Sequence, residues 1–433
     1  MAGMPAPTSP RRPRVGVTLG PDRSHAALLD GGLVVAQASV PGADLRRLLR
    51  ALPRPDVDGV TLDISRMLSD TARSAGGTGR PRVAVLRIVP RPATDDALGR
   101  HPATVVEDLV HGRFTVGGGS DLFGRALREL DLAGAERLAG LPAVRDADGI
   151  AVVAAGSHAQ PRQELAVAAV LRRRLPSAHL SLAADLGGQG LVAREATAVL
   201  DAALGRRAAD LLDEAEDAAG RLLPGAALTV ARGDGGWASL ALARAHPVLG
   251  VGAGPALQLQ GAAALAGRTD CRVVLSPAAA EGPAGHVPLG EVRHGLASVQ
   301  PYGTADLGTA LVVPTAALTW MPPAAAGSAA GTADLPLVTA DGDPLQLACV
   351  GAAVSRPTAW LDEIAVIDST ERLAEVRRDA QERATAIVTA NGAAPGTATV
   401  VEMSAVAVPY SPSGTVRVRV RIAGVADDRI GIR

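Results

Sequence analysis

The sequence contains no lysine: all 43 of its Lys and Arg positions are arginine, against 44 Asp and Glu positions and a formal net charge of −1. We interpret this bias as the coding preference of a high-GC bacterium. The absence of lysine excludes Walker-type phosphate lysines, lysine Schiff bases and lysine general bases. Aromatic residues are also scarce, with three Trp, two Tyr and two Phe. Without a basic surplus or aromatic stacking platforms, nucleic acid and membrane surfaces are not expected partners.

Long hydrophobic runs and paired cysteines are missing as well. No apolar run reaches the roughly 18 residues that a membrane-spanning helix requires. Residues 1–14 are rich in Pro and Arg and lack the apolar segment of a signal peptide, which predicts a disordered tail and a cytoplasmic location. Cys271 and Cys349 lie far apart in apolar contexts. We therefore expect buried free thiols and neither a disulfide nor a metal pair.

The most informative stretch is 15–32, VGVTLGPDRSHAALLDGG. It predicts an apolar strand at 15–19, a tight turn at 20–23, a second strand at 26–29 and a hairpin turn at 30–32. Residues 33–38 predict a third strand, and 43–52 predict an amphipathic helix. A β-β-β-α start with glycine in the first turn is how an actin-like ATPase lobe begins. In that fold the first turn wraps the nucleotide phosphates.

This stretch resembles the N-terminus of the hydantoinase/oxoprolinase family, of the hydantoinase A subunit type. The family has an apolar strand, Asp-x-Gly-Gly-Thr-x-x-Asp, and a second apolar strand that ends in Asp-Gly. The matching positions here are Gly16, Gly20, Leu28, Leu29, Asp30 and Gly31. Later segments that also resemble the family are 181–204, in which Arg194 and Glu195 are kept, and the glycine-rich segments 232–236 and 252–256.

The resemblance covers about residues 15–424 and implies an α/β fold. The fold is a two-lobed actin-like ATPase of the ribonuclease-H-like class with a central cleft. It would divide the chain into an N-terminal lobe at 15–148, a central lobe at 149–321 and a C-terminal part at 322–433 that packs back on the lobes. The family also implies assembly with a second, unrelated type of subunit.

The positions that carry chemistry in the family are replaced in this chain. Thr18 stands where the first Asp is expected, Pro21 and Asp22 replace Gly and Thr, and His25 replaces the second Asp. Residues 63–66 replace Gly-Thr-Thr-His, and the second phosphate turn is replaced by LSPAAAEG at 275–282. Proline has no N–H to donate to a phosphate. A carboxylate about 4 Å from a phosphate costs on the order of 4 kcal/mol at an effective dielectric constant near 20. We therefore expect that ATP hydrolysis is lost, that Mg-ATP does not bind and that no other cofactor is used.

Several residues are candidates for the cleft. His25, Asp22 and Asp63 could supply acid–base catalysis there; the alternative is that they are rim residues of a vestigial site. The helix start near Gly254 suits either an anion or a tight strand-to-helix loop. No metal is expected, since His158 and Glu164 provide two ligands and a site requires three or four. The residues expected to line a ligand-binding cleft are Gly20, Arg23, Arg66, Gly233, Gly235, Gly236 and Gly254.

Three further predictions concern the scaffold. The glycines at 117–119 predict a turn that precedes a helix at 122–138. Asp368, with Glu371 three residues later, predicts the N-cap of a long helix. In the strand at 415–422, arginines at 417, 419 and 421 alternate with apolar residues. This alternation indicates either a solvated strand face or a surface that docks an acidic partner.

The replaced motifs leave two functions open. The first is a degenerate family member that has lost ATP hydrolysis and serves as a structural, regulatory or ligand-binding subunit of a heteromeric complex. Its partners would be a second protein subunit and a small-molecule ligand. The second is a hydantoinase/oxoprolinase-type hydrolase that acts on the C–N bond of a cyclic amide or an amino-acid-derived metabolite.

Overall fold

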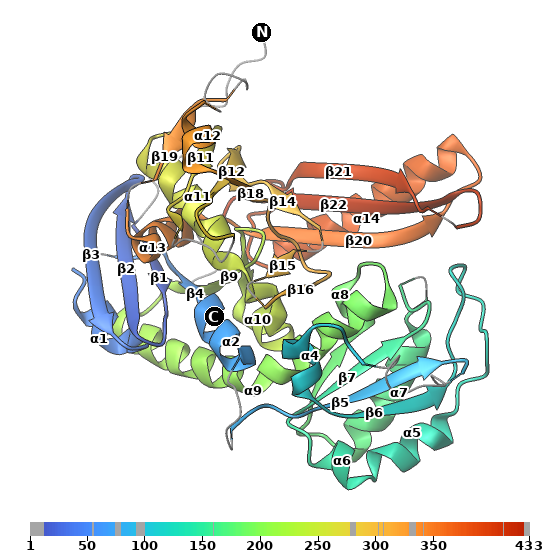
Figure 1. The fold of residues 1–433 in the computed structure, drawn as a ribbon. Helices are drawn as coiled ribbons and strands as arrows, with labels where there is room; N and C mark the ends of the chain where they lie inside the picture. Colours follow the sequence, from blue (N-terminus) through green and yellow to red (C-terminus); the bar gives the residue numbers. More distant parts are fainter. Residues whose placement is uncertain are drawn as a thin grey trace.

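The computed structural model describes residues 13–53, 56–73, 79–91, 100–158, 160–277, 283–301, 303–305, 307–328, 335–340, 342–409 and 411–427. Its strands form a six-stranded sheet, a four-stranded sheet, a five-stranded sheet and a three-stranded sheet, together with short two-stranded pairs. Figure 1 shows the six-stranded sheet on the left, the four-stranded sheet at the lower right and the three-stranded sheet at the upper right.

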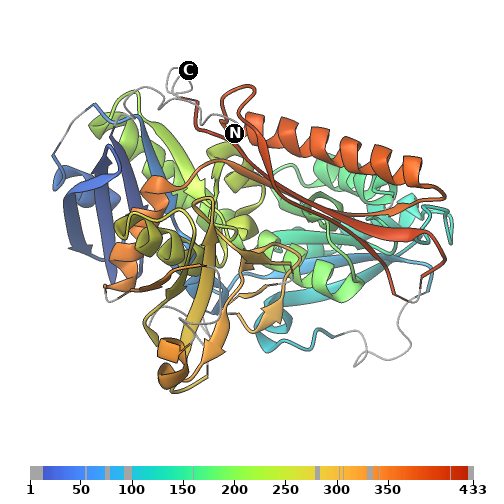
Figure 2. The same cartoon turned by 90° about the horizontal axis from the view of Figure 1, so that it is seen from above.

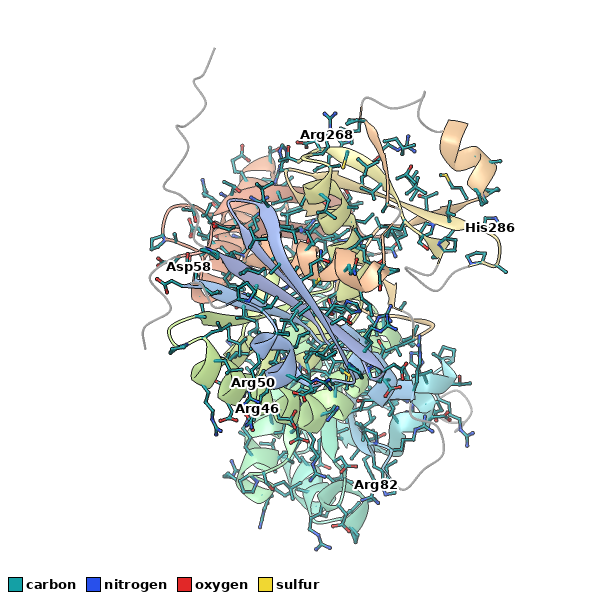
Figure 3. All side chains as sticks on the ribbon, turned by 90° about the vertical axis from the view of Figure 1, so that its left-hand side faces the viewer. Arg46, Arg50, Asp58, Arg82, Arg268 and His286 are labelled. Atoms are coloured by element: carbon teal, nitrogen blue, oxygen red, sulfur yellow. The ribbon has the colours of Figure 1, made fainter. Side chains whose placement is uncertain are left out.

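The first sheet contains the N-terminal stretch and confirms its predicted strands and hairpin. One face packs against α13 (Pro344–Val354), and Gly16 permits this approach because a Cβ there would lie 1.8 Å from the Cys349 carbonyl oxygen. The other face packs on α1 (Leu45–Arg50) and α9 (Leu191–Leu222). Arg46, labelled in Figure 3, pairs with Asp217 and so joins these two helices. The strands, in sheet order, are β10 (Trp237–Ser239), β9 (Ala227–Ala231), β4 (Gly59–Asp63), β1 (Arg14–Thr18), β2 (Arg23–Asp30) and β3 (Leu33–Pro41). The helix α2 (Ser65–Arg73) follows β4.

The four-stranded sheet is parallel throughout, with the order β6 (Val110–Gly117), β5 (Val83–Val89), β7 (Gly149–Ala154) and β8 (His179–Leu182). Its two central strands, β5 and β7, are almost entirely apolar because both of their faces are covered. The helices α5 (Leu132–Ala139) and α7 (Arg162–Arg174) cover one face, and α9 covers the other. The short helices α4 (Thr104–Leu109) and α6 (Pro142–Arg145) lie between its strands, and α8 (Ala183–Leu186) follows β8. Since β5 precedes residue 148 and β7 follows it, this sheet draws on both predicted lobes, and the predicted domain limits stay a prediction.

The five-stranded sheet forms the wall opposite the first sheet. Its order is β13 (Leu296–Ala297), β12 (Val287–Arg293), β11 (Cys271–Val274) and β19 (Leu337–Thr339), with β18 (Thr319–Met321) also paired to β12. The helix α11 (Ala253–Leu265) packs on it. Together, η1 (Pro247–Gly250) and α11 are long and apolar enough to cross a membrane by composition, but 72% of that window is buried, as expected for a core helix. The remaining elements of this part are β14 (Val299–Gln300), β15 (Thr304–Ala305), β16 (Thr309–Ala310), β17 (Thr315–Ala316) and α12 (Pro323–Ser328), while α10 (Leu240–Ala245) packs on α9 and the first sheet.

The C-terminal sheet, β20 (Thr358–Val366), β22 (Thr415–Ala423) and β21 (Thr399–Ala407), packs its apolar face on α14 (Thr370–Ala390), which Figure 2 shows lying along the strands. The prediction of a solvated arginine face is wrong. Arg417 donates to Asp362 on β20, and Arg419 lies 3.5 Å from the same carboxylate. Arg421 is 2% exposed and donates to the Asp234 and Ala297 carbonyl oxygens. The acidic partners of this ladder are in the chain itself.

Two other scaffold predictions need correction. Residues 122–131 are not helical, because the Asp121 carboxylate accepts hydrogen bonds from the Phe123 and Arg125 N–H groups and holds a loop. The helix begins only at Leu132, after Asp131 accepts from the Gly134 N–H at 2.7 Å. The N-cap of α14 is Ser369, one residue after the predicted Asp368. The two cysteines are buried and free, as predicted.

Candidate functional site

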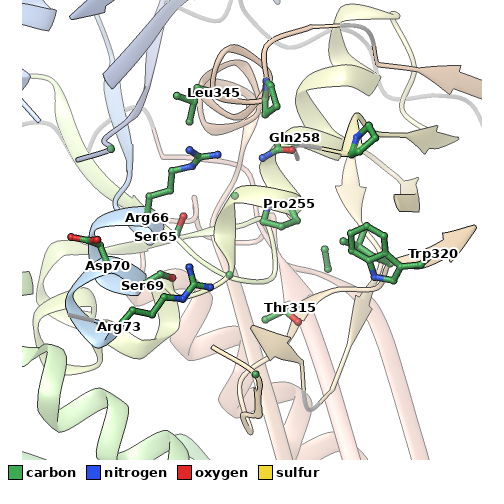
Figure 4. A pocket seen from close by; sticks show the side chains of 18 of the residues that line it. Ser65, Arg66, Ser69, Asp70, Arg73, Pro255, Gln258, Thr315, Trp320 and Leu345 are labelled. Atoms are coloured by element: carbon green, nitrogen blue, oxygen red, sulfur yellow. The ribbon is translucent and has the colours of Figure 1, made fainter. Parts of the chain in front are cut away.

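A cleft of about 1390 Å³ separates the first sheet from the wall formed by β17, β18 and the residues just before β12. Four segments that are distant in sequence line it: the turn after β1, the helix α2, and the starts of α11 and α13. Loop and strand residues between 283 and 320 close the far side. Figure 4 shows the α2 side chains facing Pro255, Thr315 and Trp320 across this space. The cleft lies at the carboxyl ends of β1 and β4, where ligands bind in open α/β sheets.

The helix α2 presents a polar stripe to the cleft. Its buried residues, including Leu68 and Ala72, pack into the core, so the helical period leaves the other side to polar residues. Arg66 is exposed and extends toward Gln258, as Figure 4 shows. The residues of the stripe are Ser65, Arg66, Ser69, Asp70 and Arg73.

Two longer helices begin at the cleft. Gly252 precedes α11 in the left-handed conformation, with φ at 74°, which glycine adopts without strain. This turn places Gly254 and Pro255 on the cleft wall. At the start of α13, the Asp343 carboxylate accepts from the Leu345 N–H at 2.9 Å. Helix N-termini favour negative charge. At α13 the Asp343 carboxylate already supplies that charge.

The turn after β1 offers few N–H groups to an anion. The Leu19 N–H donates to the Asp63 carbonyl oxygen at 2.9 Å, and the Gly20 N–H donates to Ser24 Oγ at 3.2 Å. Pro21 has no N–H. Positions 19–21 are therefore unable to cradle a phosphate with backbone donors, although Gly20, Asp22 and Arg23 line the cleft.

Thr18, His25 and Asp63 form a row across three neighbouring strands, behind the cleft wall; we call it the buried polar row. Thr18 is the register partner of His25 on β2 and of Asp63 on β4, so the three side chains share one face. They are 1%, 3% and 1% exposed. Within the described residues, Thr18 Oγ1, His25 Nε2 and Asp63 Oδ2 have no hydrogen-bond partner. Such atoms are costly to bury and mark a site that requires explanation.

Burial disfavours the charged form of both ionisable members of the row. Burial raises the pKa of Asp63, and hydrogen bonds from Ser65 together with the charge of Arg66 oppose this rise in part. Burial lowers the pKa of His25, although Asp343, whose carboxylate lies 4.0 Å from Nε2, opposes the shift. His25 and Asp63 thus lie inside the wall, whereas Asp22 is exposed on it.

Three of the glycines expected in the cleft lie elsewhere. A Cβ on Gly233 would lie 2.7 Å from the Val251 carbonyl oxygen, and one on Gly236 would lie 2.0 Å from Thr358 Oγ1. Gly235 has φ at 78°. This turn instead holds Asp234, which is 1% exposed and whose pKa is lowered: burial would raise it, but Arg232 and Arg421 outweigh that effect. The turn therefore joins the core to the C-terminal sheet.

Sequence reasoning missed several residues of the cleft, including Arg73, His286, Thr315 and Trp320. Arg73 could have been found by extending the helical period from Arg66. The others come from strands and loops whose approach no local pattern reveals. Of the second replaced turn, Leu275 and Pro277 are described and 278–282 lie outside the described residues. Within the described part of the chain, no group of three or more His, Cys, Asp or Glu side chains could hold a metal ion.

The α/β architecture with its central cleft is the predicted ATPase-like fold. No family model matches the sequence, and no curated protein matches it significantly. The ATP-dependent caprolactamase from Pseudomonas jessenii matches in structure with a TM-score of 0.72 at 13% identity, over 95% of this chain and 87% of that one. Acetone carboxylase in its nucleotide-free structure matches with a TM-score of 0.64 at 12% identity, over 96% and 88%. Both are hydantoinase/oxoprolinase-type enzymes. The resemblance found in the sequence is thus confirmed at the level of the fold.

Proposed function

We propose that this protein is a degenerate hydantoinase/oxoprolinase-type protein that has lost ATP hydrolysis and binds a small carboxylate ligand in its cleft. The observation that carries the proposal is the turn after β1, where residues 19–21 leave no N–H for a phosphate. Thr18 also replaces the carboxylate expected on the metal side, and Asp22 adds negative charge to the wall. An anchored triphosphate would meet repulsion where it needs donors.

Arg66 supports a carboxylate as the ligand group. It is exposed, lines the cleft and makes no hydrogen bond or ion pair to any described residue. Arg23 lines the same cleft from the β1–β2 turn. A guanidinium presents parallel N–H donors that match the two oxygens of a carboxylate.

The experiment compares two ligand classes on the purified full-length protein. Calorimetric titration with Mg-ATP is expected to show no saturable binding, and an assay for phosphate release is expected to show no turnover. Titration with aliphatic carboxylates is expected to show saturable binding that weakens at least tenfold in Arg66→Gln, the effect of losing a charged hydrogen bond. Arg268→Gln, a change at an exposed position outside the cleft lining, is the matched control. Micromolar Mg-ATP binding with turnover would overturn the proposal.

We further propose, following the family resemblance, that the protein works in a heteromeric complex with a second protein subunit. Co-expression with the product of a neighbouring gene, followed by size-exclusion chromatography, tests this part separately. A stable complex of defined mass is expected. Elution of each protein alone at its own mass, with no shared peak at micromolar concentration, would contradict it. The cytoplasmic location stays a prediction.

A second candidate function is hydrolysis of a C–N bond in a cyclic amide. It is favoured by the ATP-dependent enzymes that share the fold, one of them a caprolactamase, and by the buried polar row, where His25 and Asp63 could exchange a proton with a substrate. Turnover of a lactam panel, with and without ATP, distinguishes it from the first proposal. Turnover that His25→Gln abolishes would favour the hydrolase.

A further inference from the structure

A second chamber of about 460 Å³ adjoins the cleft behind the end of β11. Its walls come from β11, β12 and β19, and no charged residue is among the described residues that line it. Ser276 and Thr339 are its polar side chains. We call it the apolar side chamber; its apolar lining comprises Val274, Leu275, Pro277, Val287, Pro323, Leu337, Ala340 and Gly342.

The chamber and the cleft share a wall. Pro277 lines both. The segment before α13 contributes to each in turn, because Ala340 and Gly342 face the chamber and Asp343 with the next two residues faces the cleft. The cleft and the chamber therefore lie side by side along this segment.

The cleft carries charged and apolar side chains on different segments. Arg66 and Arg73 lie on α2, whereas Leu318 and Trp320 lie on and beside β18, next to polar residues such as Thr315. Figure 4 places Trp320 on the side opposite Arg66. A ligand that satisfies both walls has an acidic group at one end and an apolar body at the other.

We infer that the apolar side chamber receives the aliphatic chain of the cleft ligand, which is a straight-chain monocarboxylate with its carboxylate at Arg66. This inference rests on the proposed function of the cleft and names its ligand class. The chamber volume lies within the range of about 300–1,000 Å³ that is typical of small-molecule sites. Desolvating the chain against apolar side chains supplies the affinity, and the guanidinium fixes the orientation.

The test is a calorimetric series of monocarboxylates from acetate to decanoate on the full-length protein. Each added methylene that enters the chamber is expected to tighten binding about fourfold, until the chamber is full. Leu337 packs at the edge of the apolar cluster in the chamber, so Leu337→Asn is expected to flatten the dependence on chain length. Leu265→Asn, a change at a leucine that is 57% exposed and lies outside both linings, should leave it intact.

The outcomes separate this inference from the proposed function. Arg66→Gln is expected to weaken all chain lengths by the same factor and to keep the slope. Equal affinity for acetate and decanoate would overturn the chamber assignment while leaving carboxylate binding in place. An unchanged slope in Leu337→Asn would also overturn it, since the chain would then lie elsewhere. If no carboxylate binds, both this inference and the proposed ligand class fail.

Discussion

Glu164 and Asp63 are both almost fully buried carboxylates, but the protein holds them in opposite ways. Glu164, at the carboxyl edge of the parallel sheet, accepts the Ala154 and Ala184 N–H groups at 2.7 Å each, and also the Ser157 hydroxyl. Arg194 lies 3.5 Å from the same carboxylate. Asp63, beside the cleft, accepts the Ser65 N–H on one oxygen and has no partner on the other.

The contrast indicates that Glu164 supports the fold, whereas Asp63 belongs to the candidate site. A buried carboxylate whose two oxygens are both hydrogen-bonded fixes the elements around it, and here Glu164 ties β7, α7, α8 and α9 together. A buried carboxylate with an unsatisfied oxygen gives no such support and costs stability. Proteins keep such groups where function requires them. We therefore expect Glu164 to be essential for folding and Asp63 to be a residue whose removal stabilises the protein.

The largest effect is expected for Glu164→Gln. This change leaves Arg194 buried without its countercharge, and the free energy of unfolding should fall by about 3–5 kcal/mol. Urea unfolding followed by circular dichroism measures it. Glu136→Gln is the control: Glu136 pairs with Arg173 at 3.6 Å on the surface, and such pairs contribute about 0–1 kcal/mol. If Glu164→Gln does not fold, the double variant Glu164→Leu/Arg194→Met should recover folding. A fall of less than about 1 kcal/mol in the free energy of unfolding would show that Glu164 and its partners do not stabilise the fold.

Asp63→Asn should raise the free energy of unfolding by about 1–3 kcal/mol near neutral pH. The variant no longer buries an ionised carboxylate with an oxygen that lacks a hydrogen-bond donor. Since the folded pKa of Asp63 is raised above its ordinary value of 3.8, the wild type loses stability as the pH rises above that value. The gain of the variant should therefore shrink toward acid pH. Thermal melts at several pH values measure this, with Asp30→Asn at an exposed hairpin position as the control. Lower stability of Asp63→Asn at every pH would contradict the assignment.

The same comparison shows what the sequence could and could not reveal. The strands and hairpin of the first sheet followed from alternation and from Asp30-Gly31-Gly32. Gly20, Arg23, Arg66 and Gly254, which were chosen by motif position, line the cleft, and their role in ligand binding stays a prediction. Hydrogen-bond satisfaction is not local, however. No pattern near Glu164 predicts its donors, because Ala184 and Arg194 come from α8 and α9, and no pattern near Asp63 reveals that its second oxygen has none. The prediction for the arginines of β22 was wrong for the same reason. Alternation shows that these arginines share one face of the strand, but it does not show that Asp362 of β20 lies against that face.

A third buried carboxylate sharpens the comparison. Asp201 accepts from Ser181 Oγ at 2.8 Å and from the Val248 N–H at 3.1 Å, and His246 Nδ1 lies 3.3 Å away. Burial alone would lower the pKa of His246, but the hydrogen bond and charge of Asp201 raise it above its ordinary value of 6.5. The stabilisation is therefore present below pH 6.5 and is lost as the pH rises through the folded pKa.

His246→Gln should abolish the contribution of the His246–Asp201 pair to the pH dependence of stability. The free energy of unfolding should therefore fall more at pH 6 than at pH 8, and by less than in Glu164→Gln. Urea midpoints at the two pH values measure it. His286→Gln, a change at a half-buried histidine of the far cleft wall, should leave the profile unchanged. An equal loss for His246→Gln at both pH values would show that His246 acts by packing alone.

The smallest effect on stability is expected for Arg66→Gln. Arg66 is exposed and makes no hydrogen bond or ion pair to the described residues, so the free energy of unfolding should change by less than about 0.5 kcal/mol. Urea unfolding of this variant beside Arg268→Gln, a position labelled in Figure 3, measures the difference. If Arg66→Gln leaves stability unchanged but weakens carboxylate binding, then Arg66 serves binding, whereas Glu164 serves the fold. A stability loss of more than 1 kcal/mol would instead assign Arg66 to the scaffold, because its guanidinium would then hold the cleft wall in place.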